Sequence, residues 1–241
     1  MPVVCAVVVL TPRPSVFLHS PPHSSTRRAG IAGATQLPFH GADNALDASS
    51  PNEGKQRFEK MISGMYLGEI ARLLMQQLAA AGELFGAGVA AASFRGLSTP
   101  WSLKTEVLAE LSEDTTPDLA GVGRALERSL GVGASTTLAD RRTAVEVAAL
   151  VARRAARLSA VGVAAVLEQM GLPAGNGVNV AIDGSVFKKY PHFAEWMGEA
   201  LTELGASPGL VVAEDGSGLG AALVAAVAMS GGAVSSRTHA S

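Results

Sequence analysis

The chain has 241 residues, of which 48% are hydrophobic and 17% are charged, and its formal net charge is −2. This length is enough for one or two domains with a sizeable core, so a wholly disordered chain is excluded. The near-neutral charge lacks the basic footprint of a general nucleic-acid binder. The single cysteine, Cys5, cannot form an internal disulfide, which fits a reducing compartment. The apolar run Val3–Leu10 is far shorter than the ~20 residues of a membrane-spanning helix, so a transmembrane anchor is not expected.

The two ends of the chain differ in composition from its middle. Residues 1–42 contain no Asp or Glu, three arginines, several prolines and scattered Ser and Thr. This composition fits a transit peptide and fits an unstructured extension equally well. Residues 231–241 are rich in Gly and Ser without an apolar period, and we expect them to fray. We therefore expect one folded domain over residues 43–230.

The spacing of apolar residues in the first part of this domain predicts helices. Over Lys55–Ala81 they recur every three to five positions, as on an amphipathic helix, and Gly82 is its expected end. Shorter helices are expected over Lys104–Leu111 and Leu119–Leu130. A long Ala-rich helix is expected over Thr137–Met170, largely buried, with its wetter side marked by Arg142, Arg153, Arg154 and Arg157.

The last third of the chain changes character. The apolar runs 178–182 and 210–213 predict two buried strands. Residues 191–204 and 219–229 have helical spacing. Strand, crossover helix, strand and helix form a βαβα unit, in which the two strands are parallel and the fold class is α/β.

Each of these strands ends in an Asp-Gly-Ser turn, at Asp183–Ser185 and at Asp215–Ser217. Glycine there lets backbone N–H groups approach a phosphate, and the second turn runs directly into the expected helix, whose dipole favours an anion. Asp-Gly also makes ordinary turns, and both readings stay open. A dinucleotide site is not expected, because no acidic residue follows Asp215 to bind a ribose.

A third polar group stands at the head of the first long helix. Gln56 and Glu59 are three residues apart, so their side chains share one helix face, and Asn52 precedes them. An amide and a carboxylate side by side can bind the neighbouring hydroxyls of a sugar, although such a pair is also typical of a solvated helix cap. We find no His/Cys spacing for a metal and no Ser/His/Asp signature.

Four segments go beyond generic patterning. Gly54–Ile70 reads GKQRFEKMISGMYLGEI, Ala155–Ala160 reads AARLSA, Asp183–Lys188 reads DGSVFK and Glu214–Leu223 reads EDGSGLGAAL. In this order they closely resemble the signature helix, the long core helix, the adenosine motif and the second connecting motif of eukaryotic hexokinases. Asp114–Leu119 and Leu219 look more like the plant and algal branch. The resemblance covers about residues 43–229.

This resemblance implies a fold and an activity. The fold would be a helix-rich part of the actin-like ATPase (ribonuclease H-like) fold, the hexokinase large domain. The activity would be that of an ATP:D-hexose 6-phosphotransferase at the entry to glycolysis, with Mg²⁺ bound through the phosphates of ATP and glucose as a typical hexose. The expected compartment is the cytosol, or a plastid or mitochondrion if residues 1–42 act as a targeting segment.

The resemblance also assigns residues. It places Gln56 and Glu59 at the hexose. Thr99 falls where the family has a nucleotide-contacting Thr, although Pro100 and Trp101 follow it where the family usually has Lys/Arg-Gly. The expected nucleotide-binding residues are Gly64, Met65, Thr99, Asp183, Gly184, Ser185, Gly216 and Ser217.

The chain departs from the family at its N-terminal side. Hexokinases carry an Asp-x-Gly-Gly-Thr phosphate loop on a hairpin and then a small domain with the catalytic Asp, and no Asp-x-Gly-Gly-Thr occurs in this chain. General-base catalysis contributes roughly 10²–10⁴-fold, so little turnover is expected from this chain alone. The alternatives are a non-catalytic sugar- or nucleotide-binding regulatory protein and a helical remnant without a ligand. Without the hairpin we expect an open sheet edge and self-association there.

Overall fold

The computed structural model describes residues 6–10, 16–18, 37–86, 95–132 and 136–213. The segments that resemble the second connecting motif, with the expected helix 219–229 and the tail 231–241, lie outside these described residues. The elements in chain order are β1 (Ala6–Leu10), β2 (Val16–Leu18), α1 (Gly41–Ser49), α2 (Arg57–Ile62), α3 (Gly64–Ala80), α4 (Arg95–Ser98), α5 (Thr105–Glu113), α6 (Ala120–Leu130), α7 (Leu138–Gln169), β3 (Asn179–Asp183), α8 (Ser185–Lys189), α9 (Phe193–Glu203) and β4 (Gly209–Val212).

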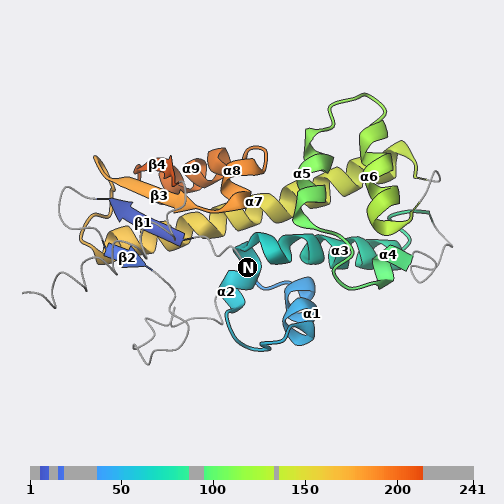
Figure 1. Cartoon of the computed structure of the whole chain (residues 1–241), viewed down its shortest axis with the longest axis horizontal. Coiled ribbons are helices and arrows are strands. Elements are labelled where there is room, and N and C mark those ends of the chain that lie inside the picture. The colour runs from blue at the N-terminus through green and yellow to red at the C-terminus, as the bar shows by residue number, and fades with distance from the viewer. Residues whose placement is uncertain (1–5, 11–15, 19–36, 87–94, 133–135, 214–241) are drawn as a thin grey trace, which may run out of the picture.

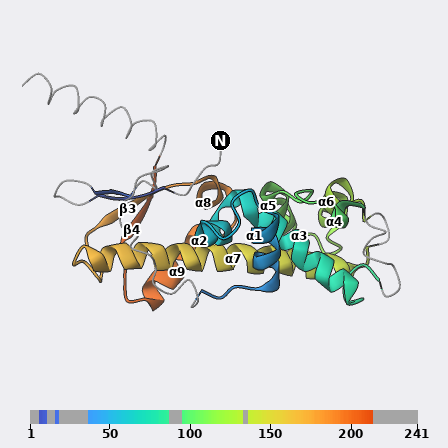
Figure 2. The same ribbon diagram turned by 90° about the horizontal axis from the view of Figure 1, so that it is seen from below.

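The long helix α7 is the centre of the structure. Its 32 residues span about 48 Å at ~1.5 Å per residue. The other helices and the sheet are arranged along it: α3, α5 and α6 lie along its N-terminal half, and α9 and the sheet lie beside its C-terminal half (Figures 1 and 2). Alanine and valine dominate its buried face, which brings neighbouring helices close. The expectation of a long, largely buried helix is confirmed.

The start of α7 is fixed by its own side chains. The Thr137 hydroxyl accepts a hydrogen bond from the Asp140 N–H at 3.1 Å, and the Asp140 carboxylate accepts one from the Thr137 N–H at 2.8 Å. This reciprocal pair satisfies two N–H groups that lack partners inside the helix. Asp140 also accepts the N–H of Phe85 at 2.7 Å. The cap thus ties the chain that follows α3 to the beginning of α7.

The sheet has the order β2-β1-β3-β4. β3 and β4 are parallel, with Val180 opposite Leu210 and Ile182 opposite Val212. The intervening α8 and α9 form the crossover, and α9 packs on α7. The expected strand, crossover and parallel strand are therefore confirmed, but β4 is not buried as predicted, since Val211 and Val212 are 44% and 48% exposed.

The N-terminal region differs from the expectation. Within residues 1–42, expected to be unstructured or a targeting segment, Ala6–Leu10 forms a strand that pairs antiparallel with β3, and Val16–Leu18 pairs with Ala6–Leu10. The apolar run Val3–Leu10 is too short to span a membrane as a helix, but a short run of β-branched residues is also typical of a strand. Since β1 covers one side of β3, the predicted open edge does not exist there; the edge strands among the described residues are β2 and β4.

The helix expected over residues 55–81 is two helices. α2 ends at Ile62, Ser63 is extended with φ −77° and ψ 135°, and α3 begins at Gly64. The apolar spacing continues through this break, which is why periodicity alone did not reveal it. The break turns the chain so that the start of α3 meets α8: a Cβ on Gly64 would lie 2.5 Å from Cγ2 of Val186. α1 and the short helix α4 were also not expected.

Candidate functional site

The loop between α1 and α2 is anchored by one carboxylate. Asp47 accepts a hydrogen bond from Nζ of the buried Lys60 at 2.6 Å and from the N–H of Gly54 at 3.1 Å. Burial by itself raises the pKa of Asp47, but the hydrogen bonds from Lys60 and Gly54 lower it more, so that the carboxylate stays ionised. Lys60 also donates to the carbonyl oxygen of Asn52 at 2.9 Å. These contacts hold the loop that carries Asn52 and Gln56.

Asn52, Gln56 and Glu59 form a row of hydrogen-bonded side chains at the start of α2, called the polar row below. Nδ2 of Asn52 donates to Oε1 of Gln56 at 2.5 Å, and Nε2 of Gln56 donates to Oε2 of Glu59 at 2.7 Å. The hydrogen bonds run in one direction along an exposed surface. Within the described part of the chain, nothing donates to Oε1 of Glu59. The row therefore leaves a carboxylate oxygen and amide hydrogens free for a polar ligand.

Gln56 is held in an unusual backbone conformation. Its φ of 52° and ψ of 34° lie in the left-handed region, although it is not a glycine. Side chains with a β-carbon are strained there. Such strain is most common at functional sites, where surrounding contacts impose it. Here the side chain of Gln56 is held at both atoms of its amide group, by the hydrogen bond from Asn52 and by the hydrogen bond to Glu59.

Glu59 lies close to the first turn of α3. The pKa of the Tyr66 hydroxyl is raised, first by burial and second by the negative charge of Glu59. The Tyr66 ring lies 6.1 Å from that of Trp101, in a tilted arrangement. The polar row and the beginning of α3 are thus neighbours in space and not only in sequence.

Gly64 and Ser185, two of the expected nucleotide-binding residues, line one pocket. It has a volume of about 90 Å³ and is also lined by Thr105, Val186 and Tyr190, among others. This volume is well below the ~300–1,000 Å³ of ordinary ligand pockets. Gly216 and Ser217, which the resemblance assigns to the same ligand, lie outside the described residues. A nucleotide bound here would therefore fill this pocket with only a part of its surface.

The neighbouring turn begins where β3 ends. Asp183 forms an ion pair with Nζ of Lys188 at 3.0 Å, and Gly184 caps α8 in an extended conformation with φ −176°. Because any residue adopts this conformation, Gly184 is not required by the turn itself. Met65, next to Gly64, is 58% exposed on the first turn of α3.

Thr99 is placed differently from the other candidates. Its hydroxyl donates to the carbonyl oxygen of Arg95 at 2.7 Å, inside its own turn, and Thr99 does not line the pocket of Gly64 and Ser185. The following turn is held by Glu69, which accepts the N–H of Trp101 at 2.7 Å. Gly64 and Ser185 therefore line one pocket, and neither Thr99 nor any residue of the polar row is among the residues that line it.

Two further residues belong to this region and were not expected. The hydroxyl of Thr105 donates to the carbonyl oxygen of Gly64 and accepts the N–H of Gly68 at 3.0 Å, which joins α5 to the start of α3. Tyr66 is influenced by the charge of Glu59, and its ring lies beside that of Trp101. A single Thr at the first position of a helix and a single Tyr within one carry no sequence signal, so neither could be singled out.

The described residues contain neither a cluster of metal ligands nor a membrane-spanning helix. No group of three or more His, Cys, Asp or Glu side chains in this part of the chain could hold a metal ion. None of the described helices combines the length and the apolar character that crossing a bilayer would demand.

Comparison with known proteins decides the family. The family model described as Hexokinase matches residues 29–227. The chain belongs to the hexokinase family. As a hexokinase-family protein it has the expected helix-rich α/β architecture, part of the actin-like ATPase fold. Its match begins upstream of residue 43, where the sequence resemblance was expected to start.

Individual relatives agree with this assignment. The chain is 41% identical over 211 residues to Hexokinase-3 of Oryza sativa subsp. japonica, covering 80% of this chain and 41% of that protein. It is 39% identical over 200 residues to the chloroplastic Hexokinase-2 of Nicotiana tabacum, covering 79% and 39%. A solved hexokinase from Schistosoma mansoni, complexed with glucose, aligns with a TM-score of 0.68 at 31% identity, covering 78% of this chain and 41% of that one. The chain spans about two fifths of the length of these relatives.

Proposed function

We propose that this hexokinase-family chain supplies one wall of a site for ATP-dependent phosphorylation of the 6-hydroxyl of a hexose such as glucose. The polar row is the observation that carries this proposal. Sugar hydroxyls both donate and accept hydrogen bonds, and the row offers the free oxygen of Glu59 beside the amide of Gln56. The solved relative complexed with glucose and the family match support the same ligand class.

The roles of the chain's residues follow from their positions. Glu59 accepts hydrogen bonds from sugar hydroxyls, and Gln56 orients Glu59 through the bond at 2.7 Å. Gly64 and Ser185 bring backbone close to the nucleotide, because neither places a bulky side chain in the pocket that they share. Mg²⁺ bound to the phosphates would supply charge neutralisation for phosphoryl transfer. Residues 52–66 and 183–190 therefore bind and orient ligands on one side of the transfer.

Calorimetric titration of the chain with glucose tests the sugar role. Glu59→Gln keeps the size of the side chain and replaces the accepting oxygen by an amide, so we expect at least ~10-fold weaker binding, a loss of about 1.4 kcal/mol. Glu110→Gln is the matched control, because Glu110 is an exposed glutamate that pairs with Arg128 on α6, away from the polar row. Equal heats for the parent chain and Glu59→Gln would refute the sugar role.

A coupled assay with ATP and glucose tests the reaction itself. None of the residues assigned here acts as the base for the 6-hydroxyl, so we expect turnover near background from this chain alone. Glucose binding without turnover also fits the second candidate, a non-catalytic sugar-binding regulatory protein, and the intact polar row favours it. Turnover comparable to that of ordinary kinases, about 1–100 s⁻¹, would contradict the assignment of roles.

We propose the cytosol as the compartment, with a plastid or mitochondrion as the alternative if residues 1–42 act as a targeting segment. Two similar hexokinases carry chloroplastic names, which supports the plastid alternative. Imaging of the full chain fused at its C-terminus to a fluorescent protein distinguishes the two compartments. Signal confined to an organelle would refute the cytosolic proposal.

A further inference from the structure

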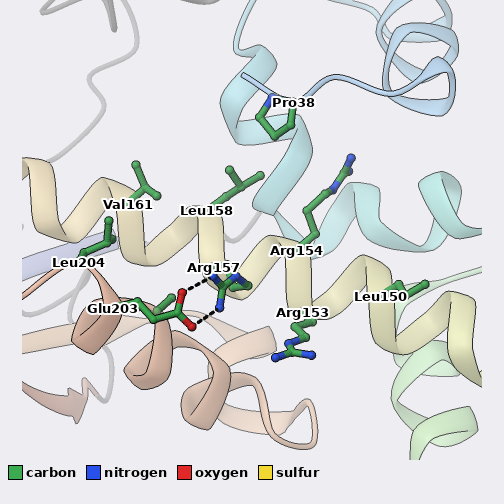
Figure 3. A pocket seen from close by; sticks show the side chains of 10 residues that line it. Pro38, Leu150, Arg153, Arg154, Arg157, Leu158, Val161, Glu203 and Leu204 are labelled. Carbon is green, nitrogen blue, oxygen red and sulfur yellow. Dashed lines mark hydrogen bonds and ion pairs between the residues drawn. The ribbon is translucent and has the colours of Figure 1, made fainter. Parts of the chain in front are cut away.

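Ion pairs along α7 join one helix to another. Arg157 on α7 donates to Glu203 on α9 at 3.0 Å (Figure 3), and Arg154 on α7 donates to Asp43 on α1 at 2.7 Å. Both arginines line the groove of Figure 3, and each already faces a carboxylate. Lys60 differs from them, because it joins two helices to the loop between them.

The ammonium group of Lys60 is buried and has acceptors on two different segments. Lys60 is 2% exposed, and Nζ donates to Oδ1 of Asp47 at 2.6 Å and to the carbonyl oxygen of Asn52 at 2.9 Å. Asp47 lies on α1, Lys60 on α2, and Asn52 in the loop 50–56 that connects these helices. Because a buried charge is costly unless it is paired, the ammonium and its two acceptors constrain one another.

The loop 50–56 is anchored at the same two acceptors. The N–H of Gly54 donates to the Asp47 carboxylate at 3.1 Å, and the N–H of Lys55 donates to the carbonyl oxygen of Asn52 at 3.0 Å. The loop ends at Gln56, whose left-handed backbone conformation is strained and must be imposed by its surroundings. The buried ammonium therefore lies at the centre of the contacts that give this loop its shape.

Arg57 ties α2 to α1 without contacting the loop through a hydrogen bond. Its Nη2 donates to Oδ1 of Asn44 at 2.6 Å, and its Nε lies 3.6 Å from Oδ2 of Asp47. If Lys60 loses its charge, Asp47 therefore keeps Arg57 and the N–H of Gly54 as partners. Removal of the ammonium is expected to release the loop and to leave α2 attached to α1.

We propose that Lys60 is a positioning residue of the sugar site: it holds the loop 50–56 in the arrangement that forms the polar row. This role rests on the proposed function, in which Glu59 binds the sugar. A loop that is ordered before the ligand arrives does not have to be ordered at the cost of binding free energy. If only about a tenth of the molecules had the competent arrangement, the apparent dissociation constant would rise about 10-fold.

Calorimetric titration of the full chain with glucose tests this role in Lys60→Met, which keeps a long unbranched side chain and removes the charge. We expect the dissociation constant to rise at least ~10-fold. Arg72→Met is the matched control, because Arg72 is 4% exposed and likewise donates to a carboxylate, that of Glu69, and to a backbone carbonyl, that of Leu97. Its bonds lie on α3 and α4, so we expect a lower unfolding free energy but an unchanged dissociation constant for glucose.

Two results of the titration would overturn the proposal. One is a dissociation constant in Lys60→Met equal to that of the parent chain. The other is an equal rise in Lys60→Met and Arg72→Met, which would make the effect one of general stability.

Amide hydrogen exchange followed by NMR, without ligand, tests the loop itself. In the parent chain the amides of Gly54 and Lys55 are expected to be protected, and in Lys60→Met we expect both to exchange at least ~10-fold faster. Unprotected amides in the parent, which require no folded variant, or unchanged protection in Lys60→Met would overturn the positioning role. A parent chain that shows the expected exchange but binds no glucose would refute the sugar site and still support the ordering of the loop by Lys60.

Discussion

Two glutamates ten residues apart show how burial decides what a carboxylate does. Glu69 is 2% exposed, and its oxygens accept hydrogen bonds from Arg72 at 2.6 and 2.8 Å and from the N–H of Trp101 at 2.7 Å. Glu59 is partly exposed and accepts one hydrogen bond from the described residues, from Gln56. A buried charge must be fully paired, whereas a half-exposed charge can keep capacity for a ligand. The first carboxylate therefore belongs to the core, and the second is available for binding.

The largest expected effect comes from breaking the buried pair. Glu69→Gln leaves the guanidinium of Arg72 buried without a counter-charge and weakens the support of the turn at Trp101, so we expect a loss of about 3–5 kcal/mol of unfolding free energy. Urea denaturation measures it. Glu110→Gln, which breaks an exposed pair with Arg128, is the control and is expected to cost less than ~1 kcal/mol. Similar urea midpoints for Glu69→Gln and Glu110→Gln would contradict the distinction between buried and exposed carboxylates.

A second substitution tests the packing of α3, the helix that also carries Glu69. A Cβ on Gly68 would lie 2.3 Å from the carbonyl oxygen of Leu103 and 2.8 Å from the nitrogen of Thr105. Because these are backbone atoms, Gly68→Ala must displace the chain before α5, and we expect about 1–3 kcal/mol of destabilisation.

Gly198→Ala is the matched control for this substitution. Gly198 lies inside α9, and a Cβ there meets nothing within 4 Å. We expect a gain of about 0.5–1 kcal/mol, since alanine favours a helix more than glycine does. Melting temperatures that shift in the same direction in both variants would show that the close approach of α3 and α5 is not rigid.

A third effect concerns pH. Burial by itself raises the pKa of Asp140, but hydrogen bonds from the Thr137 hydroxyl and from the N–H groups of Thr137 and Phe85 lower it more. The folded-state pKa thus lies below the unfolded value of about 3.9, so this stabilisation is present above pH 4 and is lost as the pH falls through the folded-state pKa.

Asp140→Asn removes the stabilisation by the ionised carboxylate, and we expect it to lower the unfolding free energy by about 1–3 kcal/mol at pH 7. As the pH falls below the unfolded-state pKa, the difference between the variant and the parent chain is expected to shrink, because the parent carboxyl becomes protonated. Measurement of unfolding free energy from pH 2.5 to 7 checks this. A constant difference across that range would exclude an ionised Asp140 as the cause.

The parts of the fold that follow from local pattern were predicted from the sequence. The long helix α7 and the parallel pair β3 and β4 have strong apolar periods, and both were found close to the expected residues. The break at Ser63 was missed because the apolar period runs through it. The pairing of β1 with β3 joins residues at least 169 positions apart, and no local pattern specifies such a partner.

The candidate site was predictable only in part, for a similar reason. The spacing of Gln56 and Glu59 placed them on one face, and the hydrogen bond between them agrees with that. The roles of Tyr66 and Thr105 depend on how α3 meets α2 and α5, which single residues in a sequence do not reveal. Thr99, assigned by family resemblance, does not line the Gly64–Ser185 pocket, and its role stays a prediction.

The smallest expected effect is on the stability of the polar row. Glu59→Gln changes a partly exposed side chain that accepts one hydrogen bond from the described residues, so we expect the unfolding free energy to change by less than ~0.5 kcal/mol. Differential scanning calorimetry checks this expectation. A larger loss would place Glu59 with Glu69 among the structural carboxylates.

Hydrogen exchange with and without ligands tests the central claim most directly. If the polar row and the turn after β3 face a sugar and a nucleotide, glucose is expected to slow amide exchange in peptides covering residues 52–66. A non-hydrolysable ATP analogue is expected to slow exchange over residues 183–190. Unchanged exchange in both segments at saturating ligand, with protection appearing only elsewhere in the chain, would contradict the account.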